Sequence, residues 1–529
     1  MSASENSNAP AQRLLIPSEA RNLSSFARLA PSVHALAALA VLVHFLFNRQ
    51  YGYFRDELYY IACSKHLSAG YVDQPPFSIL VLACTRLLFG DSVFAIRAVP
   101  AIASALSVMT LCLLVRRIGG GRTAMFLASL CFLASPLLLA THTYYSMNSL
   151  DVLFWLLAAY TLVHVIERPS LPAWLRLGAI IGLGLLNKTS VLWLGAGVVM
   201  AVLLTGLRRQ LRVPGPYLAG LLALLISSPF IVWNLLHGLP HLEFLRNATE
   251  GKYSSLTRAR FLADQCLVMN PATFLVSLPG LWWCLFDRDG RRHRALAVVF
   301  LTVFAVLLAN PHTKAEYMGP AYPPMFACGA VAISWLSHRW RAVAVPGIAG
   351  LLVVSGAVLA PLAMPILPLK EYIGYAKTLG IAPSTPENLR VSELPQFFAD
   401  MQGWEDLARD VSAVYRQIPE SEQRTTVALP GNYGEAGALE LYATRYSLPR
   451  VICSHNSYWF WGVGATPITT FIRLGGTREK YLEKYSDVTL AGVHHSRYAM
   501  PYEDSLGIFI ARERRVPIEQ DWPSNKHFE

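Results

Sequence analysis

The residues with the clearest chemical potential lie in one short segment, 49–77, which follows the first apolar run of the chain. Its charged and polar side chains include Arg55, Asp56, Glu57, Asp73 and Gln74. A carboxylate at the mouth of an apolar cavity can act as a general base and take a proton from an acceptor hydroxyl or amine during group transfer. Nearby tyrosines such as Tyr60 fit an interfacial belt or sugar stacking. Adjacent charges also occur on solvated loops, so the residues alone leave a catalytic loop and a surface loop open.

The composition indicates that most of the chain lies in a membrane. Of the 529 residues, 53% are apolar and 15% are charged, whereas about 25% are charged in soluble chains. The last 160 residues, 370–529, hold 20 of the 34 acidic residues, so this segment has an ordinary soluble composition and the rest does not. The excess of basic residues behind the net charge of +11 lies between apolar runs, where cytoplasmic loops usually carry it. It therefore indicates no nucleic acid partner.

Eleven apolar runs are candidate transmembrane helices by their length. They lie near 31–48, 93–115, 123–141, 150–166, 173–187, 189–207, 216–236, 271–286, 294–310, 319–337 and 342–365. Lys and Arg in short loops favour the cytoplasmic side, and with 1–30 as a cytoplasmic tail every predicted cytoplasmic loop is basic. We therefore predict an α-helical polytopic protein with about 11 transmembrane helices over 31–365 and a first outside loop at 49–75.

An odd number of spans places 366–529 outside the cytoplasm, where the pattern predicts a small α/β domain. Short runs of β-forming residues occur at 425–429, 487–491 and 507–511, with a helix-like stretch at 435–444. A glycine-rich stretch, 431–437, follows the first of these runs. It lacks the spacing of a dinucleotide-binding turn, which leaves a structural turn and a contact with a saccharide or lipid headgroup open.

Cysteine and histidine spacing gives no metal or disulfide signature. The eight cysteines include no C-x-x-C pair, so neither a disulfide framework nor a zinc cluster is predicted. The histidines of the predicted outside loops fit no ligand spacing. We therefore assign no metal ligand and no certain cofactor, and leave a divalent metal open.

Four stretches, in order along the chain, resemble a known group of membrane enzymes. They are FRDELYY at 54–60 with YVDQPP at 71–76, YYSMNSLD at 144–151, GLGLLNK at 182–188 and KAEYMGPAYPP at 314–324. These stretches are similar to motifs of the protein O-mannosyltransferase and aminoarabinose-transferase group, which are GT-C fold glycosyltransferases of the family 39/83 type. The resemblance covers about residues 31–340.

The resemblance implies a membrane glycosyltransferase that moves one sugar from a polyprenyl-phosphate carrier to an extracytoplasmic acceptor, with inversion. It assigns catalysis to Asp56 and Glu57, the donor phosphate to Lys314, Arg55 and Lys188, and acceptor or sugar binding to Asp151, Gln74, Tyr60 and Tyr317. One position departs from the pattern, because Gln74 stands where aminoarabinose transferases carry a phosphate-contacting lysine. The sugar is therefore not assigned.

Other interpretations stay open at this point. Lys188 fits a side chain that snorkels to the membrane surface, and Asp151 fits an acid favoured by a helix N-terminus. The acceptor is lipid A or lipopolysaccharide, a cell-wall glycan or a protein, at the bacterial inner (plasma) membrane. The rival functions are a multi-span transporter or flippase of a lipid-linked saccharide, and a membrane scaffold. Transporters usually have repeated halves and a site at the midplane, whereas the polar residues here gather at one interface.

Overall fold

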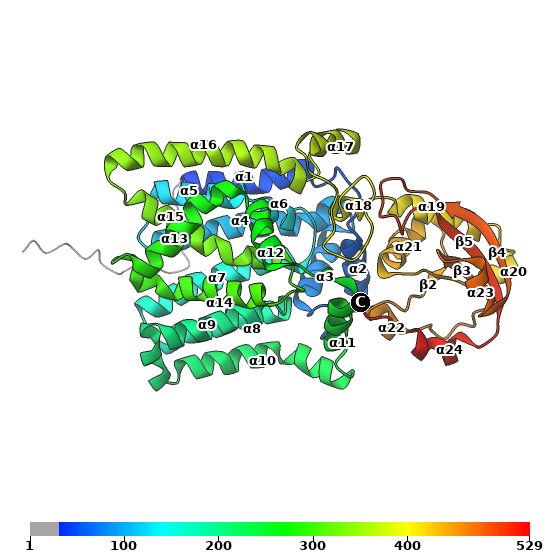
Figure 1. Cartoon of the computed structure of the whole chain (residues 1–529). Coiled ribbons are helices and arrows are strands. Elements are labelled where there is room, and N and C mark those ends of the chain that lie inside the picture. Colours follow the sequence, from blue (N-terminus) through cyan, green and yellow to red (C-terminus); the bar gives the residue numbers. More distant parts are fainter. Residues whose placement is uncertain (1–30) are drawn as a thin grey trace, which may run out of the picture.

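Apolar helices of 12 to 26 residues that lie side by side form most of the molecule, as the computed structural model of residues 31–529 shows (Figure 1). They are α1 (Pro31–Phe47), α4 (Val93–Arg117), α5 (Arg122–Leu133), α7 (Met147–Glu167), α8 (Leu171–Asn187), α9 (Val191–Leu204), α10 (Gly215–Leu236), α13 (Phe274–Phe286), α14 (Arg294–Ala309), α15 (Tyr322–Ser334) and α16 (His338–Ala363). Small residues let some of these helices approach closely. A Cβ at Gly329 of α15 would come within 1.7 Å of the Val276 carbonyl oxygen of α13.

Five helices within 31–529 are long and apolar enough to cross a membrane, and two bent helix pairs raise the count to seven. This confirms a polytopic helical membrane protein, while the count of eleven stays a prediction. Each predicted run overlaps one of the helices above. The predicted cytoplasmic tail, 1–30, lies outside the described residues.

One apolar helix was not among the predicted spans. This helix, α3 (Phe77–Phe89), has 13 residues and ends at Gly90, which has a φ of 78°. At 1.5 Å per residue it is too short to cross a bilayer core of about 30 Å. The segment before it contains a second short helix, α2 (Arg55–Lys65).

The basic connections and the C-terminal region lie at opposite ends of the helix array. Gly119, Arg292 and Trp335 come from three different connections and are direct neighbours at one end. At the other end lie α2, α11 (Pro240–Asn247) and the C-terminal sheet (Figure 1). This separation matches the alternation of basic and non-basic loops in the sequence.

The C-terminal region is built on one five-stranded sheet, in the order β2-β1-β3-β5-β4. The strands are β1 (Thr426–Leu429), β2 (Arg450–Val451), β3 (Thr470–Leu474), β4 (Tyr485–His494) and β5 (Leu506–Arg514). Strand β1 is parallel to β2 and β3, and β5 is antiparallel to β3 and β4. The predicted runs correspond to β1, β4 and β5, whereas β2 and β3 were not predicted.

The helices of the C-terminal region are α17 (Leu369–Thr378), α18 (Gln396–Ala399), α19 (Trp404–Tyr415), α20 (Glu420–Gln423), α21 (Tyr433–Tyr446), α22 (Ser457–Trp461), α23 (Arg478–Leu482) and α24 (Ile518–Asp521). One buried apolar cluster joins this region to the membrane part, because Leu58 and Ile79 share it with Leu439 and Ile508. Burial of such side chains stabilises the junction by about 1.5–3 kcal/mol each. The junction therefore holds α2 and α21 in a fixed relation.

Candidate active site

The first turn of α2 carries the charged triplet. The Phe54 backbone N–H donates to the Glu57 side chain at 2.8 Å, and acidic residues are favoured at this helix end by the helix dipole. The Asp56 side chain is 36% exposed. Its Oδ1 atom accepts a hydrogen bond from the Tyr433 hydroxyl at 2.9 Å and lies 3.7 Å from Arg55 Nε. Asp56 is therefore an accessible carboxylate with a cation beside it.

Glu57, the other predicted catalytic carboxylate, is fully buried. It pairs with Arg97 of α4, whose Nη2 atom lies 2.8 Å away, and it accepts the Tyr145 backbone N–H at 2.7 Å. Both side chains of the pair are 0% exposed, so each charge is compensated only by the other and by hydrogen bonds. The structure thus gives Glu57 the surroundings of a residue that fixes α2 on α4.

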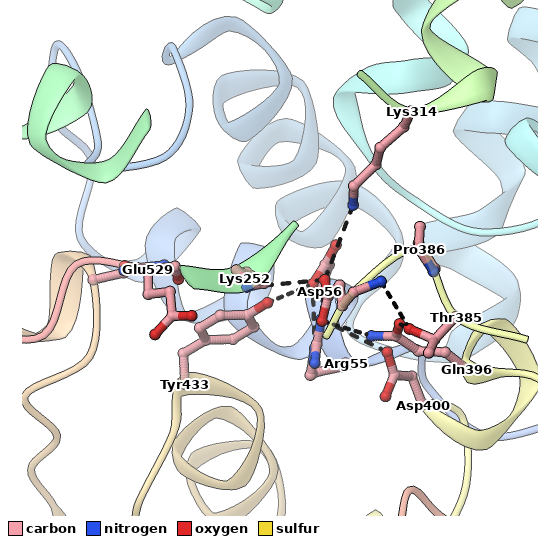
Figure 2. Close-up of polar contacts among 12 residues, drawn as sticks. Arg55, Asp56, Lys252, Lys314, Thr385, Pro386, Gln396, Asp400, Tyr433 and Glu529 are labelled. Atoms are coloured by element: carbon pink, nitrogen blue, oxygen red, sulfur yellow. Dashed lines mark hydrogen bonds and ion pairs between the residues drawn. The ribbon is translucent and has the colours of Figure 1, made fainter. Parts of the chain in front are cut away.

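Three cations converge on one carboxylate near Asp56, and we call them the cation triad: Arg55, Lys252 and Lys314. Arg55 Nη2 lies 3.8 Å from Glu387 Oε1, and the Nζ atoms of Lys252 and Lys314 each lie 4.0 Å from the same oxygen. Figure 2 shows the three side chains pointing toward a common region. Burial alone would raise the pKa of Glu387, but the triad outweighs burial and lowers it. The triad therefore binds a carboxylate of the chain itself, that of Glu387.

A short strap of the C-terminal region, residues 385–388, carries Glu387 into the triad. The Gln396 amide donates to Glu387 Oε2 at 3.0 Å. The strap is paired with the loop that carries Lys252, since the Asn388 N–H donates to the Lys252 carbonyl at 2.8 Å and the Ser254 hydroxyl donates to the Pro386 carbonyl at 3.0 Å. Figure 2 shows Gln396, Pro386 and Lys252 near the charged cluster around Arg55.

Lys188 and Asp151 form a second charged group, where the end of α8 meets the first turns of α7. Lys188 Nζ lies 3.6 Å from Asp151 Oδ2 and donates to Asn148 at 2.7 Å. Lys188 also lies over the Tyr317 ring, 5.5 Å from its centroid, and Lys314 lies over the Tyr253 ring at 4.4 Å. The structure therefore brings Arg55 and Lys314 together and pairs Lys188 with Asp151 instead.

The remaining predicted residues, Tyr60 of α2 and Gln74 of the segment before α3, are buried. Tyr60 is buried and its hydroxyl accepts the Met147 N–H at 3.4 Å. Gln74 is fully buried, with its amide 4.0 Å from the Cys63 sulfur. Asp73 accepts the Tyr59 hydroxyl at 3.0 Å, and burial raises the pKa of Asp73 to about 7.

Sequence reasoning missed three charged residues of the site, Arg97, Lys252 and Glu387. Arg97 falls inside a predicted span, and an arginine in an apolar run is a known signal of a buried partner. Lys252 lies in a loop without a recognisable motif. Within 31–529 no group of three or more His, Cys, Asp or Glu side chains is arranged to hold a metal ion.

Comparisons with known proteins find membrane glycosyltransferases among the relatives of this chain. The model of the family described as dolichyl-phosphate-mannose-protein mannosyltransferase matches residues 73–233. The chain is 23% identical over 310 residues to the lipid A galacturonosyltransferase RgtD of Rhizobium johnstonii, covering 57% of this chain and 65% of that protein. It is 28% identical over 168 residues to the undecaprenyl phosphate-alpha-4-amino-4-deoxy-L-arabinose arabinosyl transferase of Pseudomonas savastanoi, covering 30% of this chain and 31% of that protein.

The fold is similar to that of a solved enzyme along nearly the whole chain. The crystal structure of ArnT from Cupriavidus metallidurans bound to undecaprenyl phosphate matches with a TM-score of 0.60 at 15% identity, covering 91% of this chain and 98% of that one. The chain therefore has the GT-C type of fold. The resemblance to the protein O-mannosyltransferase and aminoarabinose-transferase group, inferred from the motifs, is confirmed. The matched stretches span less than two thirds of the Rhizobium and Pseudomonas relatives.

Proposed function

We propose that the chain is an integral membrane glycosyltransferase that transfers one sugar from a polyprenyl-phosphate donor to an extracytoplasmic acceptor. The observation that carries the proposal is the cation triad, which lies beside the accessible carboxylate of Asp56 and contains Arg55, its neighbour in sequence. A transfer of this kind needs a base at the nucleophile and positive charge at the departing phosphate. The triad and Asp56 supply both within one site.

The reaction assigns a separate task to each group. The acceptor oxygen attacks the anomeric carbon, and its proton passes to Asp56. The bond from the anomeric carbon to the phosphate oxygen breaks, with inversion, and its electron pair stays on the polyprenyl phosphate. Lys252, Lys314 and Arg55 stabilise the negative charge that develops there. Glu57 does not touch the substrate and holds the first turn of α2 through Arg97.

Glu387 has a defined part in this cycle. Its carboxylate occupies the centre of the cation triad, where the donor phosphate would make the same type of contact. We propose that the phosphate displaces Glu387 from the triad on binding, so the strap 385–388 moves when the donor enters. Lys188 is paired with Asp151 and lies over the Tyr317 ring, and we assign both residues to the sugar or acceptor rather than to the phosphate.

One relative supports the class of acceptor, and the basic residues support the orientation in the membrane. RgtD is described as acting on lipid A, which supports a glycolipid acceptor of the lipid A type. The gathering of Arg117 and Arg292 at the end opposite to the site supports a cytoplasmic location for that end. The site and 366–529 would then face outward from a bacterial plasma membrane. This orientation gives them access to envelope lipids.

The test is a comparison of envelope lipids from cells with and without the chain. Mass spectrometry should detect a lipid that is lighter by one sugar in cells without it, and re-expression of the wild type should restore the heavier form. If the lipids, wall glycans and exported proteins of both cells are identical, the proposal is wrong. Accumulation of a whole lipid-linked saccharide on the cytoplasmic side would indicate a flippase instead.

A further inference from the structure

The glycine-rich stretch 431–437 of the C-terminal region lies at the active site. It follows β1 and forms the first turn of α21, where the Asn432 side chain caps the helix by accepting the N–H groups of Gly434 and Glu435 at 2.8 and 3.0 Å. Tyr433 is the first residue of this helix. Figure 2 shows its ring beside the end of Asp56.

The stretch has glycines because α21 lies directly against α2. A Cβ at Gly434 would come within 2.6 Å of Arg55 Cγ, and a Cβ at Gly437 within 2.8 Å of the Leu58 backbone. Any larger side chain at these positions would push the helices apart. The contact between the two helices is therefore built to bring the start of α21 onto the charged triplet of α2.

Tyr433 uses this contact to reach Asp56. Its hydroxyl donates to Asp56 Oδ1 at 2.9 Å, and its side chain is buried, with an exposed fraction of 6%. Its ring lies 4.8 Å from the ring of Tyr59 and 4.8 Å from that of His455. Because the ring packs against these two neighbours, the hydroxyl holds the Asp56 carboxylate through Oδ1 in one orientation.

The C-terminal region also fixes the neighbouring cation. Arg55 Nη1 donates to the Tyr502 hydroxyl at 2.8 Å, and the Arg55 backbone N–H donates to the Asp400 carbonyl at 2.9 Å. Both charged residues that flank the proposed reaction centre are thus held by side chains or backbone from beyond residue 366. Membrane-part residues alone would leave Asp56 and Arg55 without these constraints.

We infer that Tyr433 is a positioning residue for Asp56, so the C-terminal region completes the catalytic site instead of serving only as an attached domain. The inference rests on the proposed role of Asp56 as base. A misplacement of about 1 Å at a reacting group can cost on the order of 100-fold in rate. A lost positioning contact should therefore appear in kcat.

The experiment compares Tyr433→Phe with Tyr446→Phe in the full-length protein reconstituted in vesicles. Both residues lie on α21 and both hydroxyls donate to a carboxylate, that of Tyr446 to Glu405 at 2.7 Å. We expect Tyr433→Phe to lower kcat by about 10- to 100-fold while the donor KM and the melting temperature stay near wild type. Tyr446→Phe should keep wild-type kinetics. Gly434→Ala should lower kcat as well, because the added Cβ displaces Arg55.

The outcomes separate the inference from the proposed function. If the wild type is active and Tyr433→Phe has the same kcat, the inference is wrong while the proposed function stands. Equal losses in kcat for Tyr433→Phe and Tyr446→Phe would overturn it too, since the effect would then belong to the stability of α21. A wild type that releases no polyprenyl phosphate from any donor would overturn the proposed function and the inference with it.

Discussion

The carboxylates of Asp56 and Glu57 are adjacent in sequence but lie in opposite surroundings. The Asp56 side chain is 36% exposed, whereas Glu57 is 0% exposed and paired with Arg97. The helical turn explains the difference, because consecutive residues of a helix point about 100° apart. One of the two can therefore meet a substrate while the other anchors the helix.

Asp56→Asn should abolish sugar transfer without unfolding the protein. The amide has nearly the same shape, and it still accepts the Tyr433 hydroxyl, but it cannot take a proton. We expect a rate loss of at least ~10²-fold with an unchanged melting temperature. Transfer rates near those of the wild type would make Asp56 an ordinary surface carboxylate.

Glu57→Gln should act on stability. It leaves the buried Arg97 guanidinium without a counter-charge, and breaking one partner of a buried pair costs about 3–5 kcal/mol. Unfolding in detergent should therefore occur at a clearly lower temperature for Glu57→Gln than for Asp56→Asn. Equal melting temperatures for the two variants would argue against an anchoring role.

Lys252→Ala and Lys314→Ala should each weaken donor binding. A charge-assisted contact contributes about 1.5–3 kcal/mol, which corresponds to roughly 10- to 150-fold in affinity. Lys188→Ala should weaken it less, because its ammonium is paired with Asp151. Lys484→Ala is the control, since that lysine pairs with Asp521 in the C-terminal region. Titration of each variant with a polyprenyl-phosphate sugar measures its affinity for the donor. An unchanged affinity in both Lys252→Ala and Lys314→Ala would contradict the assignment of the donor phosphate to the triad.

Glu387→Gln should tighten donor binding. The carboxylate occupies the triad in the absence of donor, and a site that is partly blocked binds with an apparent affinity reduced by the blocked fraction. The neutral amide competes less, so we expect affinity to increase roughly 3- to 10-fold. Weaker binding by this variant would mean that Glu387 stays in place and helps to hold the donor.

Asp73 should make stability depend on pH. Because burial raises its pKa from 3.8 to about 7, the fold favours the protonated form, and this contribution is full below about pH 4 and is lost as pH rises through 7. Asp73→Asn does not titrate, so its melting temperature should rise above that of the wild type between pH 5 and 8. The exposed Asp406 provides the control, as Asp406→Asn. A difference for Asp73→Asn that is the same at pH 5 and pH 8 would contradict the buried, protonated state.

The helices were predictable because a membrane span requires a long apolar run, and each predicted run overlaps a helix of the structure. The strands were less predictable from the sequence. Strand β2 has two residues, too few for an alternating pattern, and β3 is recognisable only through its pairing with β1 and β5. Short strands depend on partners that are distant in sequence.

The candidate site was predictable only where a motif marked it. Arg55, Asp56 and Lys314 stand in recognisable stretches, and the structure brings them together. Lys252 reaches the site because its loop pairs with residues 386–388, a contact that no local pattern reports. The different burial of Asp56 and Glu57 depends on Arg97 of another helix, so adjacent residues of the same type could not be told apart.

Release of polyprenyl phosphate is the most direct test of the central claim. The purified protein would be reconstituted in vesicles with polyprenyl-phosphate sugars and a lipid A acceptor, and both lipids followed by mass spectrometry. We predict that one donor yields free polyprenyl phosphate together with an acceptor heavier by one sugar, in equal amounts. Donors that all remain intact in the presence of active, folded protein would contradict the account.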